Sequence, residues 1–151
     1  MQLVRYRTDL GAEMLRLGHL MKIEGAFVNC DWDEQKLLNL FEQPNIFCVL
    51  GQNEGGEYVS FFLGMVCQQF FGNDWVATDL AMYVAPEHRG GSYFVRLAKE
   101  FEAWAQSVGA KEIYLGQSTG INIEKTKSMF ERLGYTPIGY STKKEILRSS
   151  L

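Results

Sequence analysis

The chain has few of the residues that build disulfide frameworks or metal centres. Only three cysteines and two histidines occur in its 151 residues. Cys30, Cys48 and Cys67 are an odd number at wide spacing, which is not typical of a disulfide framework. Cys48 and Cys67 lie in apolar runs and are expected in the core. His19 and His88 form no ligand spacing with each other or with a cysteine, so we expect no metal site.

Long apolar runs and an excess of one charge are also missing. The chain has 15 lysines and arginines against 18 aspartates and glutamates, a net charge of −3, which provides no bulk attraction for nucleic acid or an anionic membrane. The uncharged stretch 58–73 is interrupted by polar residues and glycine, so it falls short of the ~18 apolar residues of a spanning helix. The first residues lack the apolar region of a signal peptide. These absences predict a cytoplasmic protein without membrane or nucleic-acid partners.

What is present is the composition of an ordinary globular domain. The chain is 46% hydrophobic and 22% charged, close to the globular average. A chain of ~150 residues buries enough surface to form a core without disulfides or metal. No repeat, low-complexity run or Pro/Ser-rich linker marks a boundary, so we expect one domain over residues 1–151.

Hydrophobic periodicity predicts an alternation of strands and helices. Strands are expected at 2–7, 46–50, 58–71, 75–84, 111–115, 135–140 and 143–147. Helices are expected at 9–24, capped by Thr8 or Asp9, at a short segment opened by Asp31 with Glu34 and stopped by Pro44, and at 92–108 and 122–133. This order predicts an α/β (α+β) domain with a mostly antiparallel sheet of about seven strands, helices on both faces and one parallel crossover near residues 80–115.

The most specific pattern is the segment Tyr83-Val-Ala-Pro-Glu-His-Arg-Gly-Gly-Ser92. A strand breaks at Pro86, the chain turns through Arg89 and two glycines, and a helix follows. A helix N-terminus presents unpaired N–H groups that suit a phosphate, and glycine lets the backbone approach the anion closely. The alternative is an ordinary loop with a solvated arginine.

Two segments together resemble a known family. Residues 83–97, YVAPEHRGGSYFVRL, resemble motif A of the GCN5-related N-acetyltransferases, in which an apolar strand ends in V-x-P-x-x-R-G-x-G-x-G/A and a leucine-bearing helix follows. Met129-Phe-Glu-Arg-Leu-Gly-Tyr135 is similar to the L-Y-x-K-x-G-F segment that closes the family's last helix. The predicted element order is also the family's order, so the resemblance covers nearly the whole chain and implies the same fold.

The resemblance implies an enzyme that moves an acetyl group from acetyl-coenzyme A to an amine by direct attack, with no metal and no covalent enzyme intermediate. The acceptor would be a small molecule or an exposed protein amine. Backbone groups of the strand would pair with the pantetheine arm, and those of the loop would hold the pyrophosphate. The implied donor-binding residues are Met82, Tyr83, Val84, Arg89, Gly90, Gly91, Ser92, Tyr93, Phe94, Asn122 and Phe130. Asn122 is also a helix-cap candidate. Relatives often carry an asparagine near this position that contacts the donor, and counting back from Gly134 places the matching position at Ile123.

Two departures from the family pattern affect these expectations. Ser92 and Phe94 stand where the family loop usually has glycine. Phe130 stands where many relatives carry tyrosine as the general acid, and phenylalanine has no proton to donate. Water is one substitute donor. Tyr83, Tyr93 and Tyr135, which lie in the motifs, are the other candidates, and a core or surface position is the alternative for each.

The catalytic base and the acceptor pocket are expected outside the loop. Asp79 is the only carboxylate in strand 75–84, and Glu24 ends the first helix beside the connection that borders the acceptor pocket in the family. Both are catalytic candidates, and a solvated surface position is the alternative for each. Residues expected near the acceptor are His19, Phe27 and Trp32. Pocket or core positions are open for Phe70, Phe71 and Trp75.

Two other functions stay open at this point. A non-catalytic acyl-coenzyme A binder is favoured by Phe130 and by the altered loop glycines. A protein-interaction module without a donor is the other, with a homodimer surface formed by the strand that carries Phe61, Phe62, Phe70 and Phe71.

Overall fold

A computed structural model describes residues 1–25, 28–116 and 122–146. The strands are β1 (Gln2–Arg5), β2 (Ile46–Gln52), β3 (Tyr58–Gln68), β4 (Trp75–Val84) and β5 (Glu112–Tyr114). The helices are α1 (Gly11–Glu24), α2 (Glu34–Phe41), α3 (Tyr93–Ser107) and α4 (Ile123–Arg132), with short 3-10 turns at Thr8–Leu10 and Pro86–His88.

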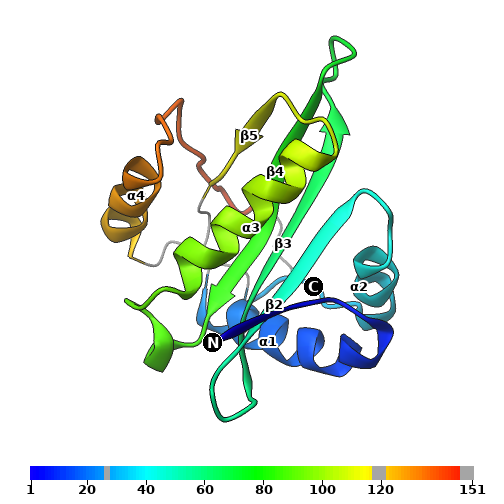
Figure 1. Cartoon of the computed structure of the whole chain (residues 1–151), viewed down its shortest axis with the longest axis vertical. Helices are drawn as coiled ribbons and strands as arrows, with labels where there is room; N and C mark the ends of the chain where they lie inside the picture. The colour runs from blue at the N-terminus through cyan, green and yellow to red at the C-terminus, as the bar shows by residue number, and fades with distance from the viewer. Residues whose placement is uncertain (26–27, 117–121, 147–151) are drawn as a thin grey trace.

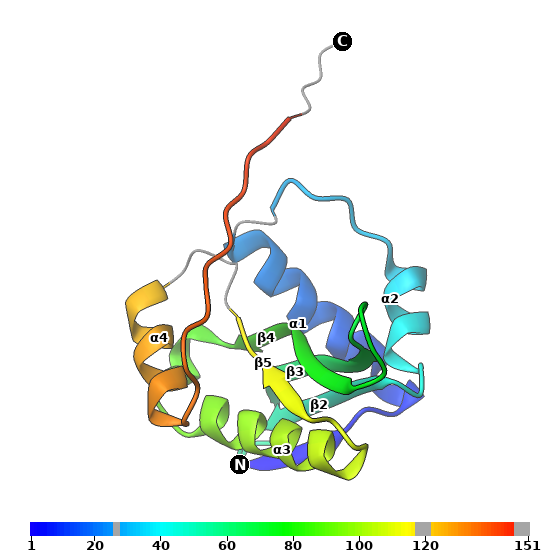
Figure 2. The same cartoon turned by 90° about the horizontal axis from the view of Figure 1, so that it is seen from above.

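The strands form one mixed sheet in the order β1-β2-β3-β4-β5. Strands β1 to β4 pair antiparallel, and β5 lies parallel to β4, with α3 as the crossover between them. Helices α1 and α2 cover one face of the sheet and α3 covers the other (Figures 1 and 2). The predicted fold class, with a mostly antiparallel sheet between helices, is therefore confirmed.

The central strands read as continuous apolar runs because both of their faces are buried. In β2, Cys48 and Leu50 pack toward α1 and α2, whereas Phe47 and Val49 pack toward α3. The Cys48 thiol is thus a core group, as its apolar neighbours predicted. The alternation of side chains along one strand supplies two cores, one on each side of the sheet.

A cluster of aromatic rings joins α3 to the sheet. The rings of Phe62 and Phe101 stack with centroids 4.6 Å apart, and Phe47 packs edge-on against both. A Cβ atom on Gly64 would lie 2.4 Å from the Phe101 ring. Glycine is therefore required at position 64 for the helix to pass this close to β3.

The strand count differs from the prediction. The described part of the chain has five strands rather than about seven, because residues 135–146 run as an extended segment without strand pairing (Figure 2). Their alternation of apolar and polar residues resembled two strands, but pairing also needs a neighbouring edge in register. Residue 147, the end of the second predicted strand, lies outside the described residues.

Two predicted helix caps are wrong, and a third candidate, Asn122, occupies the N-cap position of α4 without a side-chain capping hydrogen bond. Helix α2 is capped by Asp33, whose Oδ1 accepts a hydrogen bond from the Lys36 N–H at 3.1 Å, and not by Asp31. Asp31 with Glu34 matches the capping-box spacing, whereas Asp33 is followed three residues later by Lys36. Only the residue directly before the first turn reaches its N–H groups, and that residue is Asp33. At α1 neither Thr8 nor Asp9 caps the helix, because a 3-10 turn covers these residues first.

The predicted dimer surface on strand 58–71 is wrong for Phe61 and Phe62, which are 2% and 1% exposed in the two cores. Strand β3 ends at Gln68, so Phe70 and Phe71 lie on the following hairpin turn and are exposed. No helix in the described ranges is long and apolar enough to cross a membrane.

Candidate active site

Strands β4 and β5 separate after three paired positions. Their ladder runs from Val76 opposite Glu112 to Thr78 opposite Tyr114. Beyond it, β4 stays paired with β3 alone, with a bulge at Leu80 where the register shifts. Among the described residues, the β5 side of β4 from Asp79 onward therefore has no strand partner. Such a free edge pairs readily with an extended ligand that carries amide groups.

A cavity of about 190 Å³ opens at this fork. Its wall combines the free half of β4, the Arg-Gly-Gly loop, the end of α1 and the first turns of α4. The lining residues are Met21, Glu24, Asp79, Leu80, Ala81, Met82, Tyr83, Val84, His88, Arg89, Gly90, Gly91, Phe94, Gly116, Asn122, Lys125, Thr126 and Met129.

Most of the predicted donor-binding residues meet in this cavity. Those in its lining are Met82, Tyr83, Val84, Arg89, Gly90, Gly91, Phe94 and Asn122. Three others lie outside the lining. Tyr93 is buried beside the His88 ring, Phe130 packs on Phe94 with ring centroids 5.6 Å apart, and Ser92 begins α3 without a side-chain capping bond.

The loop before α3 places a left-handed glycine beside a helix N-terminus. Gly90 has a φ of 88°, a left-handed conformation that favours glycine. The loop leads directly into the N-terminus of α3, where backbone N–H groups are unpaired. Lys125, from the first turn of α4, lines the same cavity. Its position one helical turn after Asn122 is a periodicity signal that could have predicted it.

Glu24 and Arg89 form a two-point ion pair inside the cavity wall. The Arg89 NH1 donates to Glu24 Oε2 and its NH2 to Oε1, both at 2.6 Å. The Arg89 Nε donates to the Val84 carbonyl at 2.7 Å, and the guanidinium carbon lies 5.5 Å from the centre of the Tyr83 ring. The hydrogen bonds from Arg89 lower the pKa of Glu24. Both residues were predicted at the site, but their pairing was not.

Asp79 lies at the point where β4 and β5 part. Its carboxylate is half-buried, and both of its oxygens accept from the Gly116 N–H at 3.2 Å. Burial raises the pKa of Asp79 to about 6, against the opposing effect of the Gly116 hydrogen bond. A carboxylate with such a pKa is ionised at neutral pH and takes up a proton far more readily than an exposed aspartate.

The tyrosines considered as proton donors have different surroundings. The Tyr135 hydroxyl donates to Glu102 Oε2 at 2.7 Å, and burial together with Glu102 raises its pKa. Tyr83 lines the cavity, and burial raises its pKa. Tyr93 lies outside the lining. Phe130 sits between Phe94 and Tyr135 and supplies only apolar contact.

The residues predicted near the acceptor are not in the cavity lining. His19 and Trp32 contact each other, with ring centroids 5.5 Å apart, on the surface of α1. Phe27 lies outside the described residues. Phe70, Phe71 and Trp75 are exposed at the β3–β4 hairpin, neither in the core nor in the cavity. In the described ranges no three His, Cys, Asp or Glu side chains gather as metal ligands.

The sequence matches the acetyltransferase (GNAT) family over residues 17–135. The match spans well over half of the chain, and the chain therefore belongs to this family. A comparison of the sequence with curated proteins gave no match.

Solved structures of acetyltransferases share the fold. An aminoglycoside acetyltransferase from an uncultured soil metagenomic sample superposes with a TM-score of 0.76 at 15% identity, covering 97% of this chain and 98% of that one. An aminoglycoside antibiotic 6'-N-acetyltransferase from Acinetobacter baumannii gives 0.75 at 14% identity, covering 98% and 99%. A ribosomal-protein-alanine N-acetyltransferase from Brucella melitensis biovar Abortus 2308 gives 0.74 at 12% identity, covering 97% and 100%. At these identities the likeness concerns the fold.

Proposed function

We propose that this acetyltransferase moves the acetyl group of acetyl-coenzyme A to a primary amine of a small molecule or a protein. The observation that carries the proposal is the Asp79 carboxylate at the β4–β5 fork, in the cavity that also holds the Arg-Gly-Gly loop. A proton acceptor and an anion site in one cavity are what amine acetylation by a phosphate-bearing thioester requires.

The cavity residues fit the donor. The pantetheine arm of coenzyme A carries amides, and the free edge of β4 from Met82 to Val84 offers backbone groups to pair with them. Its diphosphate suits the N–H groups at the start of α3, with the Lys125 ammonium as a nearby cation. The side chains of Met82 and Phe94 supply apolar contact to the arm between these polar ends.

In the proposed reaction, the amine nitrogen bonds to the thioester carbonyl carbon and the carbon–sulfur bond breaks. Asp79 accepts the proton that the amine loses, directly or through one water. Free N–H groups of β4 stabilise the negative charge that develops on the carbonyl oxygen. Water or the hydroxyl of Tyr83, a residue of the cavity lining, protonates the leaving thiolate, and Asp79 returns its proton to solvent. Phe130 has no acidic hydrogen, and the Tyr135 hydroxyl already donates to Glu102.

The test is the substitution Asp79→Asn with Asp74→Asn as its control. Asp74, on the exposed β3–β4 hairpin, pairs with Lys111, which directly precedes β5. We expect Asp79→Asn to lower kcat by roughly 10²–10³-fold, as loss of a general base does, and to bind coenzyme A as the wild type does. Turnover of acetyl-coenzyme A would be measured over a panel of amines that includes aminoglycosides and N-terminal peptides of ribosomal proteins. Equal kcat in the two variants would exclude Asp79 as the base.

Phe130 supports a second candidate function, a coenzyme A binder without turnover. A hydroxyl-free residue at this position removes the proton donor that many relatives use. Calorimetric binding of coenzyme A, with no product on any amine of the panel, would favour this candidate. Restored turnover in Phe130→Tyr would then identify the missing donor as the cause.

A further inference from the structure

We infer that Glu24 is a positioning residue that holds the donor-binding loop through Arg89, and that it does not take the substrate proton. The inference rests on the proposed function, since the loop it concerns is the proposed binding site of the coenzyme A diphosphate. In this inference Glu24 is not the catalytic base, and Arg89 is not a direct ligand of the diphosphate.

The pair joins segments that are far apart in the chain. Glu24 is the last residue of α1, and Arg89 lies 65 residues later, directly before Gly90 and Gly91. Two parallel hydrogen bonds at 2.6 Å fix the orientation of the guanidinium as well as its distance. The third bond, from Nε to the Val84 carbonyl, ties the same group to the end of β4. Arg89 thus anchors the loop to a helix and to a strand.

Its surroundings set this pair apart from the surface ion pairs. The side chains of Arg89 and Glu24 are 28% and 29% exposed, whereas those of Arg7 and Asp9 are 57% and 66% exposed. Exposed pairs contribute little because water and salt screen them. A partly shielded pair with fork geometry holds its partners in place more firmly. The Glu24–Arg89 pair is therefore suited to fixing a loop.

The same contacts argue against a proton-transfer role for Glu24. Each of its oxygens accepts a charge-assisted hydrogen bond from Arg89, and these bonds stabilise the ionised form. A base must hold the proton it accepts, and this carboxylate gives up protons more readily than an ordinary glutamate. Asp79, in the same cavity, has the opposite tendency.

The contacts also direct Arg89 away from the anion. Three of its five N–H donors are used by Glu24 and Val84. The diphosphate would then be bound by the backbone N–H groups after Arg89 and by Lys125. In this arrangement the arginine acts on the anion through the shape of the loop.

The direction in which Glu24→Gln changes the Kd for coenzyme A separates this positioning role from a simple charge effect. Glu24 carries a negative charge beside the proposed anion site, so its removal should tighten coenzyme A binding if it acts only through its charge. If it positions the loop, Glu24→Gln should weaken binding, because the neutral amide loses the forked ion pair. We expect a roughly tenfold rise in Kd.

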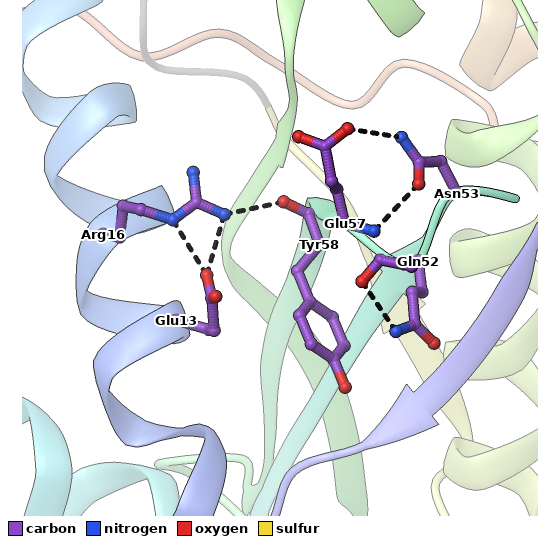
Figure 3. A network of polar contacts seen from close by, with 7 residues as sticks. Glu13, Arg16, Gln52, Asn53, Glu57 and Tyr58 are labelled. Carbon is purple, nitrogen blue, oxygen red and sulfur yellow. Dashed lines mark hydrogen bonds and ion pairs between the residues drawn. The ribbon is translucent and has the colours of Figure 1, made fainter.

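The matched control lies on the same helix. Glu13 pairs with Arg16 one turn away at 2.8 Å, and Arg16 also donates to the Tyr58 carbonyl (Figure 3). Neither residue lines the donor cavity. Glu13→Gln therefore removes a negative charge and an ion pair from α1 without touching the loop, and its Kd for coenzyme A should stay within about twofold of the wild type.

The experiment is titration calorimetry of coenzyme A into the wild type, Glu24→Gln, Arg89→Gln, the double variant and Glu13→Gln. Weaker binding by each single variant at position 24 or 89, with no further loss in the double variant, supports the pair acting as one unit. Unchanged or tighter binding by Glu24→Gln overturns the positioning role while the proposed function stands. Absence of binding by the wild type overturns both.

Two further readouts cover the remaining outcomes. In steady-state kinetics, Glu24→Gln should raise the donor KM and leave the acidic limb of the pH profile unchanged, whereas loss of that limb would make Glu24 the base. If Glu24→Gln does not fold, Glu24→Asp replaces it, since it keeps the charge but is one methylene too short for the fork. Wild-type affinity in Glu24→Asp would then overturn the inference.

Discussion

The part of the chain from β1 to α3 and the part after it are held together very differently. All buried residues of the described structure lie at or before Ala105. After it come a three-residue strand, a helix with no buried residue, and the extended segment 135–146 (Figure 2). Yet α4 and its N-cap residue supply Asn122, Lys125, Thr126 and Met129 to the cavity at the β4–β5 fork. The first part, called the scaffold from here on, thus holds both cores, whereas the second part, the wall, borders the cavity without a buried residue.

The largest expected effect compares one phenylalanine from each part. Phe101 of α3 is fully buried, whereas Phe130 of α4 is only half-buried against Phe94. We expect Phe101→Ala to lower the free energy of unfolding by about 3–5 kcal/mol and Phe130→Ala by about 1 kcal/mol. Urea denaturation followed by circular dichroism would measure both. Similar losses would mean that α4 belongs to the cooperative core.

Binding of coenzyme A should reduce the difference in local stability between the scaffold and the wall. At ~100 times its Kd, coenzyme A should stabilise the folded state by about 2.7 kcal/mol. We expect hydrogen exchange to slow most in residues 112–116 and 122–132, because this wall has the fewest contacts of its own. The amides of β2 and β3 serve as the internal control. Equal protection throughout the chain would contradict the division into scaffold and wall.

A smaller effect concerns Asp79, the carboxylate at the junction of the two parts. Its pKa rises from 3.8 to about 6 on folding, so the folded state binds more protons between these pH values and loses stability as the pH rises through them. Below about pH 4 the Asp79 carboxyl is protonated in both the folded and the unfolded state. Above about pH 6 the destabilisation caused by its buried charge no longer changes with pH. The difference between 3.8 and about 6 corresponds to about 3 kcal/mol, which the partial exposure of Asp79 to solvent reduces to about 2 kcal/mol. Asp79→Asn should therefore raise the free energy of unfolding by about 2 kcal/mol at pH 7 and change it little at pH 4. Thermal melts at both pH values would measure this, and a loss of stability at pH 7 would show that the Gly116 hydrogen bond outweighs the cost of burial.

Local sequence patterns predicted the scaffold well. The bounds of β4 were predicted as they are found, since ten residues of strand pattern end two residues before Pro86. The loop at Arg89 to Ser92 was located from glycine content and the following helix. These signals are carried by neighbouring residues, so one sequence suffices to recognise them.

Other features depend on contacts that no short pattern encodes. The Glu24–Arg89 pair joins residues 65 positions apart. Phe61 and Phe62 were predicted to form a dimer surface because the sequence does not show the core residues that cover them on the two faces of the sheet. The choice between Asp31 and Asp33 as a cap was set by where the first turn of α2 begins. The segment 135–146 had the alternation of a strand but has no paired edge.

The free edge of β4 has a consequence for the life of the protein in a cell. An unpaired strand edge is a template on which other chains can add, and proteins usually cover such edges. Here the proposed cover is the donor itself. The ligand-free chain would then be the form most exposed to aggregation and proteolysis, and its abundance would follow the supply of coenzyme A.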